Sequence, residues 1–243
     1  MDLCCGKGGD IPKWRDSGGD YVLGVEKVVD NLYNPKDGAC VRYLNYSDTA
    51  QKTSSNMPEI EFILADVSNS LDASLDANPL YFEEGEEQQE QPNTQRRSRK
   101  RTNAFEEYRN RKDYEMSRKI WSIQRKEKFH IITCQFAYHY MWESKYHLQN
   151  FMSNVEDHLV DGGYFIATAY DGKTVFNMLK NKSTDDGVSI YEDNTKLWEI
   201  KKRYSLNSFE DDSTCLGYTI DVFQESINKM TPEYLVNYDY FNR

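Results

Sequence analysis

The chain begins MDLCCGKGGD (residues 1–10), a short apolar run followed by a loop that contains Gly6, Gly8 and Gly9. IPKW at residues 11–14 has its proline where a helix starts. A glycine loop that leaves a strand and opens a helix lets backbone N–H groups approach a ligand closely. The loop lacks the third glycine of the dinucleotide fingerprint in its usual place, and it does not continue as a P-loop. The stretch predicts a strand-loop-helix unit, with a bound ligand or a tight turn without one as the alternatives.

Short apolar runs and helical patterns alternate outward from this loop. Asn34 is predicted to cap a helix that has Pro35 in its first turn and runs through Leu44. Ser144 is predicted to cap a second helix, whose apolar residues recur through Leu159 and which the Asp-Gly-Gly at 161–163 would end. Strands are predicted at 21–25, 61–65, 129–134 and 164–169. This alternation predicts an α/β fold with a mostly parallel sheet.

Composition limits the class of protein. The 243 residues carry a formal net charge of −10, so any contact with nucleic acid must come from a local basic patch. The length suits one substantial core, and a single domain over residues 1–243 is expected. The five cysteines include no C-x-x-C pair, which argues against a disulfide framework or a zinc site. No signal peptide or run of membrane-spanning length is visible, so a soluble, intracellular protein without membrane contact is expected.

The composition changes over residues of about 83–128, which begin EEGEEQQEQPNTQ and continue with RRSRKR at 96–101. The first part is acidic and without apolar residues, which predicts disorder, and the rest is charged and compatible with a helix. The segment is therefore interpreted as an insertion into the α/β domain. A solvated charge run is the favoured interpretation of RRSRKR, and the alternatives are an arm that contacts RNA and a localisation signal.

Two acids and an aromatic segment follow predicted strands, at the sheet edge where α/β folds bind ligands. Glu26 ends the strand after the glycine loop, where a carboxylate can accept both hydroxyls of a ribose. Asp66 follows the next strand, where it could accept from an adenine amino group. QFAYHY at 135–140 offers aromatic faces and one histidine, which suit a purine base. The structural alternatives are ordinary acids at strand ends and core aromatics with a hydrogen-bonded histidine; the combination favours an adenosyl ligand.

The segments DLCCGKGGDIPKW (2–14) and CQFAYHYMWES (134–144) resemble the mRNA cap guanine-N7 methyltransferase family, with its D-L-x-C-G-K-G-G-D and Q-F-x-x-H-Y patterns. LGYTIDVFQESINK (216–229) and EYLVNYDYFNR (233–243) are similar to the methyltransferase domain of mRNA capping enzymes of large DNA viruses (giant viruses). The resemblance implies a Rossmann-like, S-adenosylmethionine-dependent class I methyltransferase fold with a mostly parallel central sheet, truncated at both ends. The implied reaction moves the methyl group of S-adenosylmethionine to nitrogen 7 of the cap guanosine.

The resemblance also implies residue roles. Lys7 would meet a cap phosphate, and Glu233 would accept hydrogen bonds from the Watson–Crick edge of the guanine. On the residues alone, Glu233 follows a Thr-Pro pair and is an acid in the first turn of a helix. No acid or base catalyst and no metal is expected, because N7 carries a free lone pair and proximity and alignment suffice; Glu233, His139 and Tyr140 would line the guanine. The cofactor would be bound by Cys4, Gly6, Glu26, Asp66, Gln135 and Tyr140, and the cap by Lys7, His139 and Glu233.

The chain departs from the family pattern at two site residues and at both ends. Cys4 stands where the family usually has glycine, and Glu26 is a longer acid where the family has aspartate. Family segments that close over cofactor and cap, before the first strand and after Arg243, are lacking, so the chain is expected to begin and end inside a domain.

The expected partners are the GpppN end of 5'-capped RNA and the triphosphatase and guanylyltransferase domains of the same polypeptide. The expected location is the virion or host cytoplasm for a viral protein and the nucleus for a cellular one. Two alternatives remain open. One is a catalytically incompetent methyltransferase-like module that binds the cap or a partner protein, and the other is a methyltransferase for another RNA or a small molecule.

Overall fold

A computed structural model of the chain describes residues 1–71 and 128–243. The chain divides into two compact units. The first comprises Met1–Cys134 and Ser153–Ile166, and the second comprises Gln135–Met152 and Ala167–Arg243. The single domain over residues 1–243 stays a prediction, and the insertion predicted at about 83–128 lies, apart from Lys128, outside the described residues.

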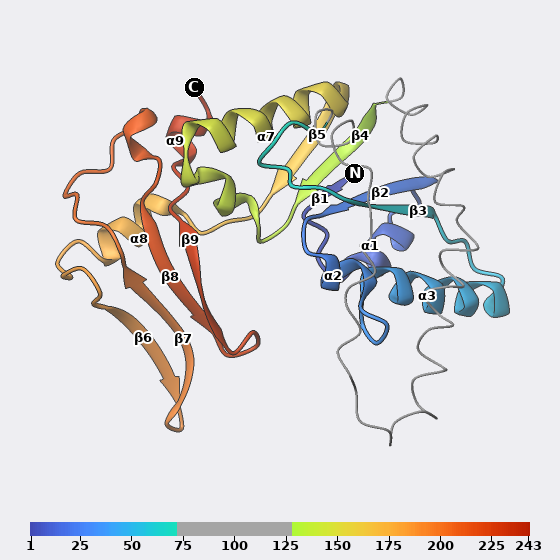
Figure 1. The fold of residues 1–243 in the computed structure, drawn as a ribbon, viewed down its shortest axis with the longest axis horizontal. Coiled ribbons are helices and arrows are strands. Elements are labelled where there is room, and N and C mark those ends of the chain that lie inside the picture. The colour runs from blue at the N-terminus through green and yellow to red at the C-terminus, as the bar shows by residue number, and fades with distance from the viewer. Residues whose placement is uncertain (72–127) are drawn as a thin grey trace, which may run out of the picture. The chain divides into compact units, whose positions relative to one another are not determined.

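The first unit is built on a sheet whose strands run in the order β3-β2-β1-β4-β5 (Figure 1). β1 (Asp2–Leu3) pairs in parallel with β2 (Tyr21–Glu26) and with β4 (Phe129–Cys134). β2 also pairs in parallel with β3 (Glu59–Leu64), and β5 (Leu159–Ala167) lies beside β4. This strand order is that of the doubly wound Rossmann fold, which confirms the predicted Rossmann-like α/β class.

Three helices connect the strands at the start of the first unit: α1 (Ile11–Asp16), α2 (Val29–Tyr33) and α3 (Ala39–Thr53). α1 follows the glycine loop, as predicted, and has proline in its first turn. The helices bury apolar side chains against β2 and β3, which fixes the position of the loop relative to the sheet. The shared core consists of Cys5, Ile11, Val22, Leu32, Ala39, Cys40, Ile60 and Phe62.

The helix predicted to begin at Asn34 begins at Ala39 instead, although its continuation through Leu44 is confirmed. Asn34 is the C-cap of α2. Its side-chain Oδ1 accepts the N–H of Lys36 at 2.9 Å, and its carbonyl accepts the N–H of Gly38 at 2.9 Å. These local bonds form a turn that competes with a helix start, which is why the asparagine does not act as the N-cap.

The Asp-Gly-Gly at 161–163 does not end a helix but lies inside β5. The preceding helix, α7 (Lys145–His158), ends before it, and the strand starts at once. A Cβ on Gly163 would lie 2.9 Å from the carbonyl oxygen of His130, so this glycine permits the close approach of β4 and β5. The strands predicted at 21–25 and 129–134 are confirmed, the one at 61–65 spans Glu59–Leu64, and the one at 164–169 ends at Ala167.

The second unit contains an antiparallel sheet in the order β6-β7-β8-β9 (Figure 1), and no strand was predicted there. The strands are β6 (Gly187–Glu192), β7 (Thr195–Lys202), β8 (Thr219–Gln224) and β9 (Lys229–Tyr234). α8 (Gly172–Met178) buries its apolar side chains in the same core as β7 and β8. That core consists of Val175, Phe176, Leu179, Ile200, Tyr204, Tyr218, Ile220, Val222 and Leu235.

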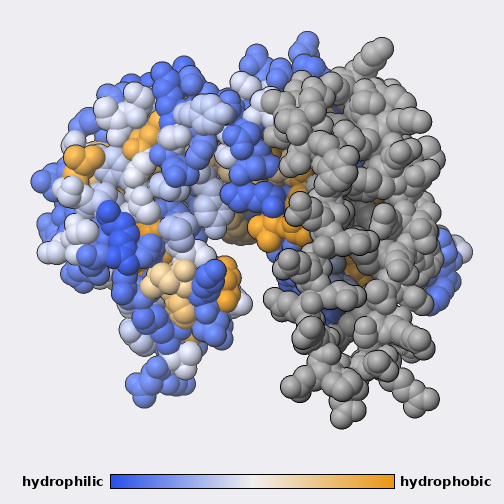
Figure 2. All heavy atoms as spheres, viewed as in Figure 1, coloured by the Kyte–Doolittle hydropathy of each residue, from blue (hydrophilic) through white to orange (hydrophobic). Residues whose placement is uncertain are grey.

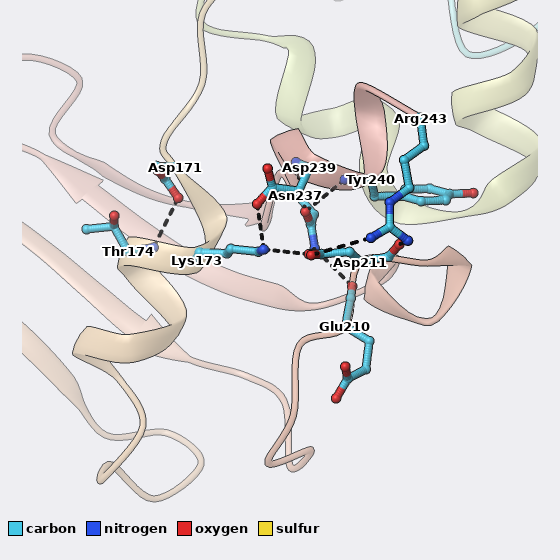
Figure 3. A network of polar contacts seen from close by, with 9 residues as sticks. All are labelled: Asp171, Lys173, Thr174, Glu210, Asp211, Asn237, Asp239, Tyr240 and Arg243. Atoms are coloured by element: carbon cyan, nitrogen blue, oxygen red, sulfur yellow. Dashed lines mark hydrogen bonds and ion pairs between the residues drawn. The ribbon is translucent and has the colours of Figure 1, made fainter.

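A polar network joins three separate segments of the second unit (Figure 3). The Nζ of Lys173 lies 2.6 Å from carboxylate oxygens of both Asp211 and Asp239. Asn237 is fully buried and caps α9 (Tyr238–Phe241), because its Oδ1 accepts from the first backbone N–H groups of that helix. Its Nδ2 donates to Asp211 Oδ1 at 3.1 Å. The network therefore holds the start of α8, the loop before η2 (Ser213–Cys215) and α9 together.

On the face drawn in Figure 2, the described residues are mostly hydrophilic and hydrophobic residues appear in small groups. Single exposed apolar side chains are usual in soluble folds, but Phe136 is 77% exposed, which is high for a phenylalanine. In the part of the chain that the structure describes, no helix has the length and apolar character needed to cross a membrane.

Candidate functional site

The glycine loop joins β1 to α1 and is tied to β2 by its backbone. The N–H groups of Cys4 and Cys5 both donate to the carbonyl of Val25, at 2.8 and 2.9 Å. Gly6 and Gly8 have φ of 55° and 70°, which glycine adopts without steric cost. A Cβ on Gly8 would lie 2.8 Å from Ile11 Cδ1, whereas a Cβ on Gly6 would meet no atom within 4 Å. Gly8 thus allows the loop to pack on α1, and Gly6 leaves open space beside the loop.

Cys4 adopts a left-handed conformation with φ 74°. A side chain in that region costs roughly 1–2 kcal/mol, which glycine would avoid. Of the two site residues that depart from the family pattern, Cys4 is therefore also strained. Interaction with the neighbouring Cys4 side chain, together with burial, raises the pKa of the Cys134 thiol well above its ordinary value.

Glu26 ends β2 and is buried against the glycine loop. Its Oε2 accepts the N–H of Gly6 at 2.9 Å. Its Oε1 accepts the N–H groups of Lys27 and Val28 at 3.0 and 2.8 Å. A carboxylate has about four lone-pair positions, and backbone donors use three of them here. Glu26 thus clamps the loop to the end of β2, and one acceptor position of its carboxylate remains for a ligand.

Asp66 follows β3, the neighbour of β2 in the sheet. Its Oδ1 accepts from the N–H and the hydroxyl of Ser68 at 3.0 and 2.7 Å, and Lys27 Nζ lies 3.6 Å from Oδ2. Burial acts to raise the pKa of Asp66, but the Ser68 hydrogen bonds and the Lys27 charge lower it below its ordinary value. Asn154 of α7 holds the chain just beyond, since its side chain bonds the backbone of Val67, Asn69 and Leu71.

Asp2 is a candidate site residue that the sequence analysis missed. It lies in β1, is 3% exposed, and its Oδ1 has no hydrogen-bond partner among residues 1–71 and 128–243. Burial, followed by the nearby charge of Asp10, raises the pKa of Asp2 to about 7. An acid inside a central strand is rare unless it has a partner, and that rarity was the available signal.

In the second unit, the turn at Gln135 and Phe136 is held by Thr168, which the sequence analysis also missed. The N–H of Phe136 donates to Thr168 Oγ1 at 2.8 Å. The hydroxyl of Thr168 donates in turn to Gln135 Oε1 at 3.2 Å. Phe136 has φ 54°, a left-handed value that is unusual for a bulky residue.

Glu233 lies in β9 opposite Ile220 of β8, so the helix predicted for this residue is wrong. The preceding Pro232, which suggested a helix start, is tolerated because β9 is an edge strand. The strand brings Glu233 Oε2 to 3.6 Å from His139 Nε2 of η1 (Tyr138–Glu143), and both side chains are buried. The ring of Tyr140 lies beside that of His139, with 4.2 Å between their centroids.

Burial shifts both members of the Glu233–His139 pair toward their neutral forms. It raises the pKa of Glu233 to about 7 and lowers the pKa of His139 to about 4. The histidine is therefore neutral at pH 7, while the glutamate lies near the midpoint of its titration. A carboxylate in this state can bind a ligand that brings its own N–H donors, because those donors stabilise the ionised form.

Lys7 of the glycine loop is paired with two acids. Its Nζ lies 2.9 Å from both carboxylate oxygens of Asp37 and 3.6 Å from Asp30 Oδ2. The hydrogen bond with Asp37 raises the pKa of Lys7, and the same bond lowers the pKa of Asp37. A ligand phosphate that binds Lys7 would compete with Asp37 for it.

The first unit thus brings Cys4, Gly6 and Glu26 together at the glycine loop. Asp66 follows β3, the strand that pairs with β2. The second unit brings His139, Tyr140 and Glu233 together, and Gln135 precedes them on the same turn. Over residues 1–71 and 128–243, no group of three or more His, Cys, Asp or Glu side chains could hold a metal ion.

Residues 85–243 match the family model of the mRNA (guanine-N(7))-methyltransferase domain. The probable mRNA-capping enzyme of Acanthamoeba polyphaga mimivirus is 29% identical over 245 residues, covering 97% of this chain and 17% of that protein. The mRNA cap guanine-N(7) methyltransferase 1 of Oryza sativa subsp. japonica is 26% identical over 180 residues, covering 74% of this chain and 35% of that protein.

The corresponding enzyme of Arabidopsis thaliana is 22% identical over 243 residues, covering 99% of this chain and 50% of that protein. The chain therefore spans half or less of the length of these relatives. The family model matches well over half of the chain, and on that match the chain belongs to the mRNA (guanine-N(7))-methyltransferase family.

Proposed function

We propose that the chain carries out transfer of a methyl group from S-adenosylmethionine to nitrogen 7 of the guanosine cap at the 5' end of mRNA. The observation that carries the proposal is the family match over residues 85–243. The names of the relatives from mimivirus, rice and Arabidopsis support it. The proposed substrate is RNA with a GpppN end.

The residues of the glycine loop fit S-adenosylmethionine. Gly6 leaves open space beside the loop, and Asp2 next to the loop has a carboxylate oxygen without a partner in the described ranges. We assign the cofactor to Cys4, Gly6, Glu26, Asp66, Gln135 and Tyr140. When bound, the cofactor supplies an electrophilic methyl group on a sulfonium. Asp66, which is ionised at neutral pH, is suited to accept a hydrogen bond from the adenine amino group.

The chemistry of the Glu233–His139 pair suits the guanine. Guanine presents N–H donors at N1 and N2, and the buried Glu233 carboxylate can accept both. The neutral His139 places no competing charge beside the base. Since N7 carries its lone pair at neutral pH, no residue has to remove a proton, and catalysis rests on alignment. The ionised Glu233 also favours the positive charge that methylation gives to the guanine.

Lys7 is proposed to bind a phosphate of the cap. The lysine is charged and its Nζ is already held by Asp37 at 2.9 Å. Each phosphate of the GpppN bridge carries a single negative charge, but the bridge as a whole carries more charge than the Asp37 carboxylate, so an exchange of partners is electrostatically favourable. Triphosphatase and guanylyltransferase domains of the same polypeptide are proposed as partners, on the likeness to the mimivirus capping enzyme.

The proposal is tested with the purified chain, tritium-labelled S-adenosylmethionine and GpppG-capped RNA. Nuclease digestion and chromatography should recover the label as 7-methylguanosine cap, and Glu233→Gln should reduce its formation strongly. Label at another RNA position would favour the alternative substrate. Binding of cofactor or cap without transfer would favour the incompetent module, and a folded chain that binds neither would contradict the proposal.

A further inference from the structure

From these contacts we infer that Thr168 is a positioning residue, which fixes both the amide orientation of Gln135 and the strained backbone at Phe136. Two bonds through one oxygen carry the inference. Thr168 Oγ1 accepts the N–H of Phe136 at 2.8 Å and donates its own proton to Gln135 Oε1 at 3.2 Å. The inference deepens the proposed function, because it rests on Gln135 as a ligand of the cofactor.

The direction of the second bond follows from the first. A hydroxyl has one proton and two lone pairs. A backbone N–H can only donate, so Thr168 must accept from Phe136 and its proton is free for Gln135. That proton selects the carboxamide oxygen of Gln135 over its nitrogen. The amide nitrogen of Gln135, which is a donor, is thereby turned away from Thr168.

The first bond also stabilises an unusual backbone. Phe136 combines φ 54° with a side chain that is 77% exposed, so neither local preference nor burial holds it in place. Strained residues of this kind persist where the surroundings over-determine them, and they cluster at functional sites. Thr168 is suited to this task, because a β-branched side chain has few χ1 rotamers and holds its hydroxyl stiffly.

Thr168 comes from a different part of the chain than the turn it holds. It directly follows β5, whereas Gln135 directly follows β4, and β4 and β5 are neighbours in the sheet. The position of the hydroxyl is thus set by regular structure. Next to it, the carbonyl of Ala169 accepts from the hydroxyl of Tyr238 at 3.2 Å, which anchors the segment that carries Thr168.

The test is a double-mutant cycle on cofactor affinity, measured by calorimetric titration of S-adenosylmethionine into the 243-residue chain. Thr168→Val keeps the shape and removes the hydroxyl, and Thr168→Ser keeps the hydroxyl. We expect Thr168→Val and Gln135→Ala each to weaken affinity by about three- to tenfold. Thr168→Ser should stay near wild type, and Thr168→Val should cost less affinity in the Gln135→Ala background than in the wild-type background. Thr174→Val, at an exposed position of α8, is the matched control and should change nothing.

Each outcome decides one question. Full affinity in Thr168→Val, or equal losses in both backgrounds, would overturn the inference. If Gln135→Ala and Thr168→Val both keep wild-type affinity for the cofactor, Gln135 is removed from the proposed cofactor site. Amide exchange of Phe136, measured without ligand, keeps the inference testable even if the wild-type chain binds no cofactor. We expect protection in wild type and Thr168→Ser and its loss in Thr168→Val; an unprotected wild-type amide would overturn the inference as well.

Discussion

Glu26 has a structural role in addition to the ligand-binding role expected from the sequence. Its carboxylate accepts three backbone N–H groups, from Gly6, Lys27 and Val28. The position of Glu26 at a strand end predicted an acceptor for ribose hydroxyls, and that role stays a prediction. The arm of glutamate, longer than that of the family's aspartate, is what allows one side chain to reach both the loop and the residues after β2.

Removal of this carboxylate should weaken the fold itself. Glu26→Ala leaves three backbone donors without their charged acceptor, and we expect the free energy of unfolding to fall by about 2 kcal/mol. Urea denaturation monitored by circular dichroism measures it. Glu156→Ala, at an exposed position of α7, is the control and should have little effect. Equal stability of the two variants would show that the clamp does not form in solution.

Glu233 gives the proposed guanine site a predicted pH dependence. Burial raises its pKa to about 7, so the carboxylate is mostly protonated at pH 6 and mostly ionised at pH 8. Only the ionised form can accept from both guanine donors, so affinity for a GpppG cap should rise about tenfold from pH 6 to pH 8. His139, with its pKa near 4, stays neutral throughout.

Titration of the cap by fluorescence quenching at pH 6, 7 and 8 measures this dependence. Glu233→Gln cannot ionise and should bind weakly with no trend over the range. A flat profile in the wild-type chain, or the same slope in Glu233→Gln, would remove Glu233 as the titrating group. The chain without ligand should respond in the opposite direction: a raised carboxyl pKa makes stability fall as the pH rises toward about 7, because the unfolded chain gives up the proton more easily.

At the scale of elements, glycine-to-alanine substitutions at two positions of the glycine loop should have different effects, one mainly on stability and the other mainly on cofactor affinity. Gly8→Ala brings a Cβ to 2.8 Å from Ile11 Cδ1 and 3.2 Å from Ala39 Cβ at a φ of 70°, and should cost about 2–4 kcal/mol of stability. Gly6→Ala meets only the backbone strain of about 1–2 kcal/mol. Its methyl group would occupy the open space beside the loop, so cofactor affinity should suffer more than stability.

Thermal unfolding together with calorimetric titration checks this pair of variants. We expect the melting temperature to fall more in Gly8→Ala than in Gly6→Ala. In Gly6→Ala, the loss of cofactor affinity should be large relative to the loss of stability. Gly6→Ala with wild-type affinity would mean that the cofactor does not approach this side of the loop.

The elements also show what the sequence could predict and why the rest escaped it. The apolar runs predicted strands β2 and β4. β2 is buried from its second residue on, as a continuously hydrophobic parallel strand is, whereas His130 and Ile131 of β4 are exposed. Two residues that usually mark helix ends gave wrong predictions. Asn34 forms a turn instead of starting a helix, and Gly163 allows a close contact between strands instead of ending a helix. The antiparallel sheet escaped because its strands mix buried apolar residues with charged ones such as Lys202 and Glu199. In the site, Thr168 escaped since a hydroxyl after a strand has no distinctive pattern.

At the scale of the whole molecule, ligand binding should raise stability if the cofactor proposal holds. A ligand at about 100 times its dissociation constant adds about 2.7 kcal/mol to a chain that binds it only when folded. For a chain of this length we expect a rise in melting temperature of roughly 5–10 °C with S-adenosylmethionine. Differential scanning calorimetry measures it, with Asp66→Ala as the variant that should respond less. No rise at saturating concentration would contradict the cofactor assignment.

The sequence predicted the Rossmann-like class and the family, and both are confirmed. The α/β class was predicted from the alternation of apolar runs and helical patterns, and the family from the paired motifs at residues 2–14 and 134–144. The assignment of Glu233 to the cap came from the resemblance alone, since the residues suggested a helix where the structure has a strand.

Strand β9, which carries Glu233, also affects whether copies of the chain can associate through the edges of their sheets. Leu235 N–H donates to Tyr218 O, and alternation along an antiparallel pair then directs the nitrogen of residue 232 away from β8. Proline at this position leaves a gap in the donor row on the outer edge of the sheet. A strand from another copy cannot form a continuous row of hydrogen bonds with β9 there. Pro232 therefore disfavours the edge-to-edge aggregation to which exposed strands are prone.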